Sequence, residues 1–116
     1  MVKKILVVDD DGDIRDSVKI ILSKNGYKVI TAVDGDDGLK KCEKEKPDLV
    51  LLDIMMPGTP IREIVPKMKN TKIVYLSVVR VSEAEKENLL SLNVKGFIQK
   101  PFDIKELVKK IKKIIG

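Results

Sequence analysis

Histidine is absent from this 116-residue sequence, and so is tryptophan. Without histidine the chain cannot build a Ser-His-Asp or Cys-His catalytic group, and most zinc sites are excluded as well. The single cysteine, Cys42, has no partner for an internal disulfide, so a reducing cytoplasm is the expected compartment. Any metal ion that the chain holds should therefore be a hard cation bound by oxygen atoms.

Long hydrophobic runs are also missing. No apolar stretch approaches the ~20 residues that a membrane helix needs, and residues 1–4 lead straight into a strand-like run, without the features of a signal peptide. Hydrophobic residues make up 43% of the chain and charged residues 35%, a mixture typical of a folded domain. We expect one domain spanning residues 1–116, with no membrane partner.

The net charge of +5 is the one compositional feature that suggests nucleic acid. The lysines, however, are scattered along the chain and form no single block. Those near the carboxyl terminus lie largely opposite an apolar stripe. We interpret them as a solvated helix face and expect no direct DNA binding, with docking of an acidic partner as the functional alternative.

Strand-like and helix-like segments alternate along the chain. Apolar runs predict strands at residues 4–8, 27–32, 48–52, 72–76 and 96–99. Helical spacing predicts helices at 13–24, 36–46, 60–69, 82–92 and 104–115. Pro60 suits the first position of the third helix, whereas Pro66 should kink or shorten it. This alternation predicts an α/β fold in which helices cover both faces of a parallel sheet.

Reactive side chains stand where the predicted strands end. In a parallel sheet all these ends meet at one edge, where ligands bind. Each residue alone has an ordinary explanation, such as a turn, a helix cap or a surface lysine. Their joint placement after four different strands is hard to obtain by accident. The residues concerned are Asp9 and Asp10 after the first strand, Asp53 after the third, Ser77 after the fourth and Lys100 after the fifth.

The chemistry of such a cluster is constrained by its charge. Carboxylates packed together raise one another's pKa unless a cation lies among them. Mg²⁺ prefers oxygen ligands, so Asp10 and Asp53 could bind it directly and Asp9 through water. A carboxylate can also act as a nucleophile and form an aspartyl-phosphate. Lys100 would then supply a fixed positive charge to the phosphoryl oxygens, and Ser77 a hydroxyl donor.

Three motifs in this order make the chain resemble the response-regulator receiver domains of two-component signalling, over its whole length. They are residues 5–11 (ILVVDDD), 47–58 (PDLVLLDIMMPG) and 100–102 (KPF). The resemblance implies a five-stranded parallel sheet, a doubly wound (βα)5 fold with the flavodoxin-like strand order 2-1-3-4-5. It also implies a signalling switch similar to stand-alone chemotaxis regulators, and not an enzyme with a separate substrate.

The same resemblance assigns roles at the strand ends. Asp53 would be the phosphoacceptor, and a sensor histidine kinase or a phosphotransfer protein would phosphorylate it in a Mg²⁺-dependent reaction. Asp9, Asp10 and Asp53 would hold Mg²⁺ together with the backbone carbonyl of Met55. Lys100 would contact the phosphoryl group, and its bond to the following proline would be cis.

Ser77 and Phe97 would form the conformational switch implied by the resemblance, although ordinary core packing is the alternative explanation for Phe97. The switch would change the face made by residues 82–92, 96–99 and the last helix. A downstream target protein would bind there, or a weak dimer would form in place of the monomer.

Some residues depart from the family pattern and leave alternatives open. Val78 follows Ser77 where the family usually has a very small residue, and neither Met55 nor Val79 could orient an attacking water. We therefore expect the phosphoryl group to be lost slowly. One alternative is a receiver-like interaction module that is never phosphorylated. Another is a phosphatase of the dehalogenase type, which would need a second acid where Met55 stands.

Overall fold

The computed structural model describes residues 2–68, 70–77 and 93–116. Its strands are β1 (Lys4–Val8), β2 (Lys28–Ala32), β3 (Leu49–Asp53), β4 (Lys72–Ser77) and β5 (Val94–Gln99). Its helices are α1 (Gly12–Lys24), α2 (Gly35–Glu45), α3 (Ile61–Ile64), the short 3₁₀ helix η1 (Val65–Lys67) and α5 (Ile104–Ile115). The helix predicted at 82–92 lies outside the described residues. None of the described helices is long and apolar enough to cross a membrane.

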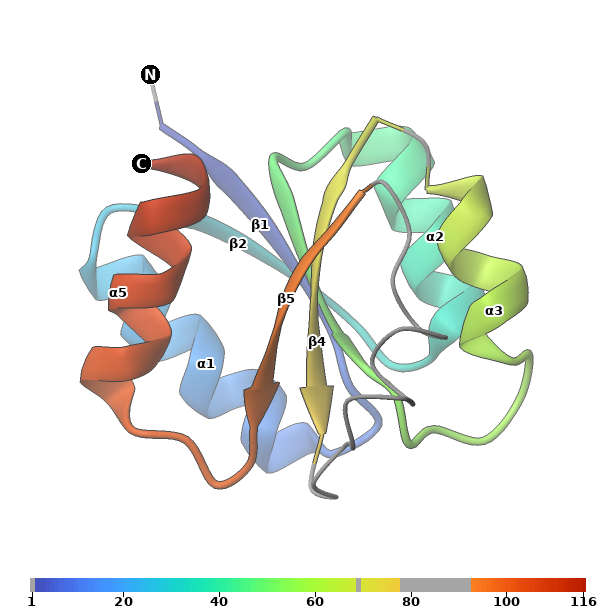
Figure 1. Ribbon diagram of the computed structural model, residues 1–116, viewed down its shortest axis with the longest axis horizontal. Coiled ribbons are helices and arrows are strands. Elements are labelled where there is room, and N and C mark those ends of the chain that lie inside the picture. The colour runs from blue at the N-terminus through green and yellow to red at the C-terminus, as the bar shows by residue number, and fades with distance from the viewer. Residues whose placement is uncertain (1, 69, 78–92) are drawn as a thin grey trace.

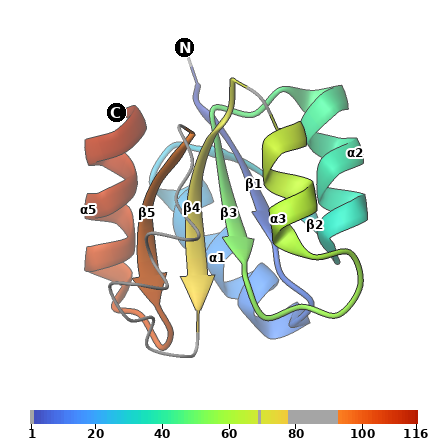
Figure 2. The same ribbon diagram turned by 45° about the vertical axis from the view of Figure 1, so that its right-hand side comes forward.

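The five strands form one sheet in the order β2-β1-β3-β4-β5, and every neighbouring pair is parallel. This confirms the predicted fold and strand order. Helices α1 and α5 cover one face of the sheet, and α2 and α3 cover the other (Figures 1 and 2). All strands therefore end at one edge, called the carboxyl edge below, and begin at the opposite one, called the amino edge.

The core consists of two layers because the sheet is buried on both sides. On β1, Ile5 and Val7 pack toward α1 and α5, whereas Leu6 and Val8 pack toward α2 and α3. All four side chains are buried. Successive residues of a strand point to opposite faces, so a strand buried on both faces appears as a continuous apolar run. The carboxyl ends of β1 and β3 are thus fixed from both sides.

Helix α2 approaches β1 closely just below the carboxyl edge. A Cβ atom built on Gly38 would lie 2.8 Å from Cγ2 of Val8, closer than real Cβ contacts allow. Glycine at this position therefore allows the helix to lie directly against the last residue of β1. The residue that follows is Asp9, so this contact helps to fix the position of Asp9.

Helix α3 is a single turn, as expected from its prolines. The chain switches to a 3₁₀ turn at Val65, because Pro66 lacks the N–H group that a continuing helix needs. The prediction for Pro60 was wrong in detail. With ψ near 144° Pro60 precedes the helix as its N-cap residue, and Ile61 takes the first position.

Both ends of the described chain lie at the amino edge (Figure 1). The hydroxyl of Tyr27, which precedes β2, donates a hydrogen bond of 3.0 Å to the backbone oxygen of Gly116. This bond joins the start of β2 to the end of α5 at the amino edge, opposite the edge that carries Asp53.

Candidate metal centre

Four of the five residues predicted to meet at the carboxyl edge are buried there. Asp9 follows β1, Asp53 ends β3, Ser77 ends β4 and Lys100 follows β5. Asp10, the fifth, is exposed to solvent. Because the strands are in parallel register, these residues from distant parts of the sequence are brought to one edge, as predicted.

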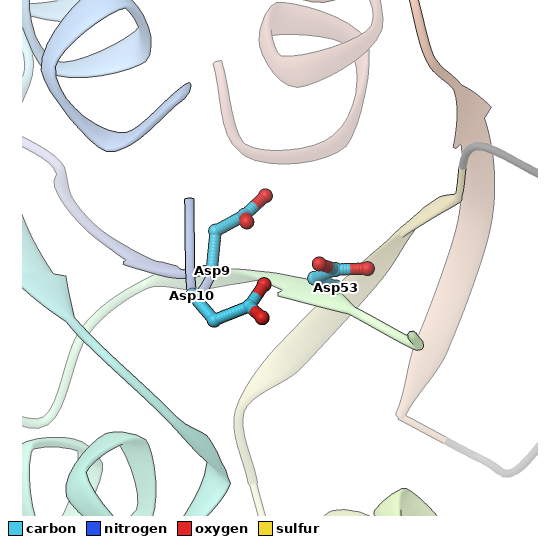
Figure 3. Close-up of side chains that lie close together, drawn as sticks. All are labelled: Asp9, Asp10 and Asp53. Atoms are coloured by element: carbon cyan, nitrogen blue, oxygen red, sulfur yellow. The ribbon is translucent and has the colours of Figure 1, made fainter. Parts of the chain in front are cut away.

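The three aspartates form a compact acidic cluster. Asp9, Asp10 and Asp53 each offer a carboxylate oxygen, and these oxygens all lie within 4.8 Å of one another. Figure 3 shows the three side chains close together at the ends of β1 and β3. Every donor in the cluster is a carboxylate oxygen, which suits a hard divalent cation such as Mg²⁺ and not a metal that prefers sulfur or nitrogen. The exposed Asp10 is on the solvent side, from which an ion can enter.

Asp9 is the most tightly held of the three. It is fully buried, one carboxylate oxygen accepts a hydrogen bond of 2.9 Å from the backbone N–H of Asp11, and the other accepts from the ammonium group of Lys100. Asp11 in turn caps the amino terminus of α1 by accepting from the N–H groups of Asp13 and Ile14. The loop that carries the acids is therefore fixed at both ends.

Lys100 is a buried cation that serves two carboxylates. Its ammonium group pairs with Asp9 and lies 3.5 Å from Oδ2 of Asp53, and the residue is only 8% exposed. The backbone N–H of Lys100 donates to the carbonyl of Ser77 at 2.6 Å, which joins the ends of β4 and β5. The bond between Lys100 and Pro101 is cis, as predicted.

Asp53 is 4% exposed, and its pKa is raised above the usual value. Burial is the largest cause, and the negative charge of Asp9 adds to it. The N–H of Met55, 2.9 Å from Oδ1, and the charge of Lys100 act in the opposite direction. A divalent cation among these carboxylates would favour the ionised form of Asp53, which is the nucleophilic form.

Met55 lies beside the site and is 56% exposed, while its backbone N–H donates to the carboxylate of Asp53. Its carbonyl as a metal ligand stays a prediction. Val78 and Val79, which the sequence places at the entrance, lie outside the described residues.

The predicted switch residues occupy different environments. Ser77 is buried at the end of β4. Phe97 is half-buried on β5, and its ring packs against that of Tyr75 with 5.3 Å between ring centroids and 51° between planes. Tyr75 stands opposite Phe97 in the β4–β5 register, and burial raises its pKa to about 12. The packing of Phe97 agrees with the core explanation and leaves its switching untested.

Sequence reasoning missed two residues. Tyr75 contacts Phe97 only because the pairing of β4 with β5 shifts by one residue between Ile73 and Val74. Arg15, in the first turn of α1, donates from Nη1 to the backbone carbonyl of Asp9 at 2.7 Å. The only available signal was its place near the aspartates, and a basic residue in a first helical turn is ordinarily a surface residue.

A doubly wound parallel sheet with an acidic triad and a buried lysine at its carboxyl edge defines a magnesium-dependent phosphoacceptor module. Residues 5–112 match the family model described as the response regulator receiver domain. The chain belongs to this family, whose members are signalling modules of two-component systems and not enzymes that turn over a separate substrate.

Individual relatives agree with this assignment. The chain is 37% identical over 118 aligned positions to the alkaline phosphatase synthesis transcriptional regulatory protein PhoP of Bacillus subtilis, covering 99% of this chain but 49% of that protein. The chain thus spans about half the length of this curated relative. The chemotaxis protein CheY4 of Vibrio cholerae is 31% identical with a TM-score of 0.88, covering 98% of this chain and 99% of that one. The response regulator TrrA of Thermotoga maritima, solved in complex with Mg²⁺ and BeF, is 38% identical with a TM-score of 0.81, covering 97% of this chain and 99% of that one.

Proposed function

We propose that Asp53 is the residue on which this chain accepts a phosphoryl group, from the phosphohistidine of a sensor histidine kinase or of a phosphotransfer protein. The observation that carries the proposal is the buried carboxylate of Asp53, which lies within 4.8 Å of two further aspartates and 3.5 Å from the ammonium group of Lys100. We place the reaction in the cytoplasm, where the single thiol of Cys42 stays reduced.

In the reaction, a carboxylate oxygen of Asp53 forms a bond to phosphorus while the bond from phosphorus to the donor's imidazole nitrogen breaks. The electron pair of that bond stays with the imidazole, which takes up a proton from water. Bound Mg²⁺, held by Asp9, Asp10, Asp53 and the carbonyl of Met55, would neutralise charge on the transferred group. No further acid or base is required of the protein.

Lys100 and Ser77 complete the site. Lys100 is already positioned between the carboxylates, so its ammonium group can contact the phosphoryl oxygens without a large movement. Ser77 ends the neighbouring strand and is joined to Lys100 through the backbone, which brings its side chain to the same edge as the carboxylates. Fixed donors of this kind stabilise transferred charge because they need no reorganisation during the reaction.

The direct test is incubation with acetyl phosphate and Mg²⁺, followed by intact-mass measurement. Wild type should gain one phosphoryl group and Asp53→Ala none, whereas the matched control Asp16→Ala, which removes an exposed carboxylate from α1, should gain it like wild type. Equal gain in Asp53→Ala would move the acceptor elsewhere. No gain in wild type that binds Mg²⁺ would favour the alternative, an interaction module that is not regulated by phosphorylation.

We propose, further, that the phosphoryl group is lost slowly. Among the described residues beside Asp53, Met55 offers only an exposed thioether where an acid or amide could orient a water for attack. A decay time of minutes or longer after removal of acetyl phosphate is expected. A half-life of seconds would contradict this, and Met55→Glu should shorten the lifetime because it supplies the missing polar group.

The output surface that we propose is the face of β5 and α5, together with residues 82–92. A hollow of about 640 Å³ on this face is lined by Phe97 and Lys100, and from α5 by three further lysines and one glutamate, namely Lys109, Lys110, Lys113 and Glu106. Lys110 also donates to the carbonyl of Phe97 at 2.7 Å, which joins this surface to the predicted switch residue. The charge favours an acidic target protein, and a weak dimer is the second candidate occupant.

Beryllofluoride with Mg²⁺, the combination found in the Thermotoga protein, provides a stable mimic of the phosphorylated state for testing this surface. Proteins retained by immobilised wild type in the presence of both reagents should be acidic, and should be lost with Asp53→Ala and with Lys109→Glu. Lys19→Glu, on the exposed face of α1, is the matched charge control. Equal retention by Lys109→Glu would exclude this surface.

A further inference from the structure

Arg15 reaches back from the first turn of α1 to the loop that carries the acids. Its guanidinium Nη1 donates a hydrogen bond of 2.7 Å to the backbone carbonyl of Asp9. The side chain lies over Gly12, since a Cβ atom built there would stand 3.4 Å from Nη2 of Arg15. Arg15 itself is held in the helix, where its N–H donates to the carbonyl of Asp11 at 3.1 Å. Arg15 is half-buried, with its guanidinium against the backbone of the acidic loop.

The three acids of the cluster are not held equally. The carboxylate of Asp9 accepts hydrogen bonds from the backbone N–H of Asp11 and from Lys100. That of Asp53 accepts one from the N–H of Met55 and forms an ion pair with Lys100. Asp10 is exposed, and within the described part of the chain its carboxylate has no hydrogen bond or ion pair. The position of the Asp10 carboxylate must therefore be set through its backbone.

The carbonyl that Arg15 contacts belongs to the peptide unit that joins Asp9 to Asp10. Because a peptide unit is planar, fixing its oxygen fixes the direction in which the Cα of Asp10 follows. A hydrogen bond from a guanidinium to a carbonyl is charge-assisted and directional. We propose that Arg15 is a positioning residue of the metal centre. It orients the Asp9–Asp10 peptide so that the Asp10 carboxylate meets those of Asp9 and Asp53, and it thereby raises the affinity for Mg²⁺. This inference rests on the magnesium site of the proposed function.

Two effects of Arg15 on Mg²⁺ have opposite signs, which makes the inference easy to test. A positive charge near a divalent cation repels it, so removing the charge alone would tighten metal binding. Removing a hydrogen bond that orients a ligand would weaken metal binding, since outer-shell partners commonly contribute tenfold or more to affinity. The direction of the change in Kd therefore distinguishes positioning from charge.

The test measures Mg²⁺ affinity by isothermal titration calorimetry, at fixed ionic strength and without any phosphodonor. Arg15→Gln should raise the Kd about tenfold. Arg15→Lys keeps the charge but loses the planar fork, so it should also raise the Kd. Lys19→Gln removes the same charge one turn further along α1 and should leave the Kd unchanged or slightly lower. An unchanged or lower Kd for Arg15→Gln would overturn the inference.

A structural readout separates positioning from a general loss of stability. In the absence of metal, the amides of Asp10 and Asp11 should exchange faster in Arg15→Gln than in wild type, whereas amides in the second half of α1 should not change. Glutamine and arginine have similar helix propensities, and the Asp11 cap is retained, so the variant should fold. Uniformly faster exchange throughout α1 would mean that Arg15 only stabilises the helix.

The calorimetry also distinguishes a failure of the magnesium site from a failure of the role of Arg15. If wild type binds no Mg²⁺, the metal site itself fails. If wild type binds Mg²⁺ and Arg15→Gln binds it equally well, only the role of Arg15 fails.

Discussion

The two edges of the sheet differ in what they bury. At the carboxyl edge Asp9, Asp53 and Lys100 are buried, and Lys100 forms ion pairs with both aspartates. At the amino edge a hollow of about 670 Å³ is larger than the one beside β5, yet its buried polar contact is neutral: Sγ of Cys42 lies 3.6 Å from Oγ1 of Thr71. The lysines around this hollow are exposed and reach water.

The comparison shows that buried charge, and not the size of a hollow, distinguishes the functional edge. Taking charges out of water is costly, and their mutual attraction offsets this cost only with good geometry. A fold that keeps two carboxylates and an ammonium group buried at one edge therefore retains them against a stability penalty. Exposed lysines around a polar hollow carry no such penalty, so their presence does not indicate a functional site.

The largest expected effect comes from removing the buried cation. Lys100→Met keeps most of the side-chain volume but leaves Asp9 and Asp53 buried without a counter-charge, so we expect a loss of about 3 kcal/mol in the free energy of unfolding without metal. Urea denaturation measures it, and Mg²⁺ should recover part of the loss. Lys67→Met at the amino edge is the control and should stay within ~0.5 kcal/mol of wild type. Equal losses of unfolding free energy in Lys100→Met and Lys67→Met would contradict the proposed difference between the two edges.

The next effect concerns the packing beneath the acids. Gly38→Ala places a methyl group against Val8 and should cost about 2 kcal/mol, because β-branched valine cannot easily move aside. The double variant Gly38→Ala with Val8→Ala should be less destabilised than the sum of the two single variants, since the second change makes room for the first. Additive losses in thermal or urea unfolding would show that the contact between α2 and β1 is not tight.

In the acid range, a pH dependence is expected from Asp53 at the carboxyl edge. Since burial raises the pKa of Asp53 from its ordinary value of 3.8, the folded protein holds a proton that the unfolded chain has already released. The stabilisation is complete below pH 3.8 and is lost as the pH rises through the raised pKa. Without Mg²⁺ the free energy of unfolding should therefore decrease across this window.

Asp53→Asn is the control for this pH dependence, because it removes the titrating group and should remove its share of the decrease. Asp37 has the opposite effect on stability. The N–H of Val33 lowers its pKa, so the stability that Asp37 contributes is lost as the pH falls. The informative quantity is thus the difference in free energy of unfolding between wild type and Asp53→Asn at each pH. A difference that does not change with pH would contradict the raised pKa.

The smallest effect is expected at the amino edge. Thr71→Val keeps the shape of the side chain and loses only a weak contact with the thiol of Cys42, so the cost should be about 0.5 kcal/mol. Burial raises the pKa of Cys42, and its thiol should react with a thiol reagent only on unfolding. A loss above ~1.5 kcal/mol would mean that the neutral pair matters as much as a charged one.

Most of the fold could be read from the sequence because β1 and β3 are buried on both faces and appear as continuous apolar runs. The predicted bounds of β1 agree with the structure, and those of β3 differ by one residue. The start of β5 was missed by two residues, since exposed Lys95 and the following glycine disguise a strand that begins at Val94. The shift in pairing between β4 and β5 is a property of neighbouring strands and leaves no local trace in either one.

The acidic cluster was predictable because strand ends and residue types suffice to bring Asp9, Asp53 and Lys100 together. The contact of Arg15 was not predictable. It depends on how one long side chain folds back over Gly12 to a backbone atom six positions earlier, and spacing alone cannot give such a rotamer. The sequence pattern thus identifies the acids, whereas the contact of Arg15 with their loop depends on the three-dimensional position of its side chain.

The hydrogen bond between Tyr27 and Gly116 has a practical consequence for reporters of this switch. It places residue 116 at the amino edge, a full strand away from Asp53, and strands of five or six residues span roughly 17–20 Å. A fluorophore or affinity tag attached there leaves the phosphoryl site open to its donor. Such a reporter cannot contact the phosphoryl group, so any change that it records must reflect a conformational change extending along the sheet or α5.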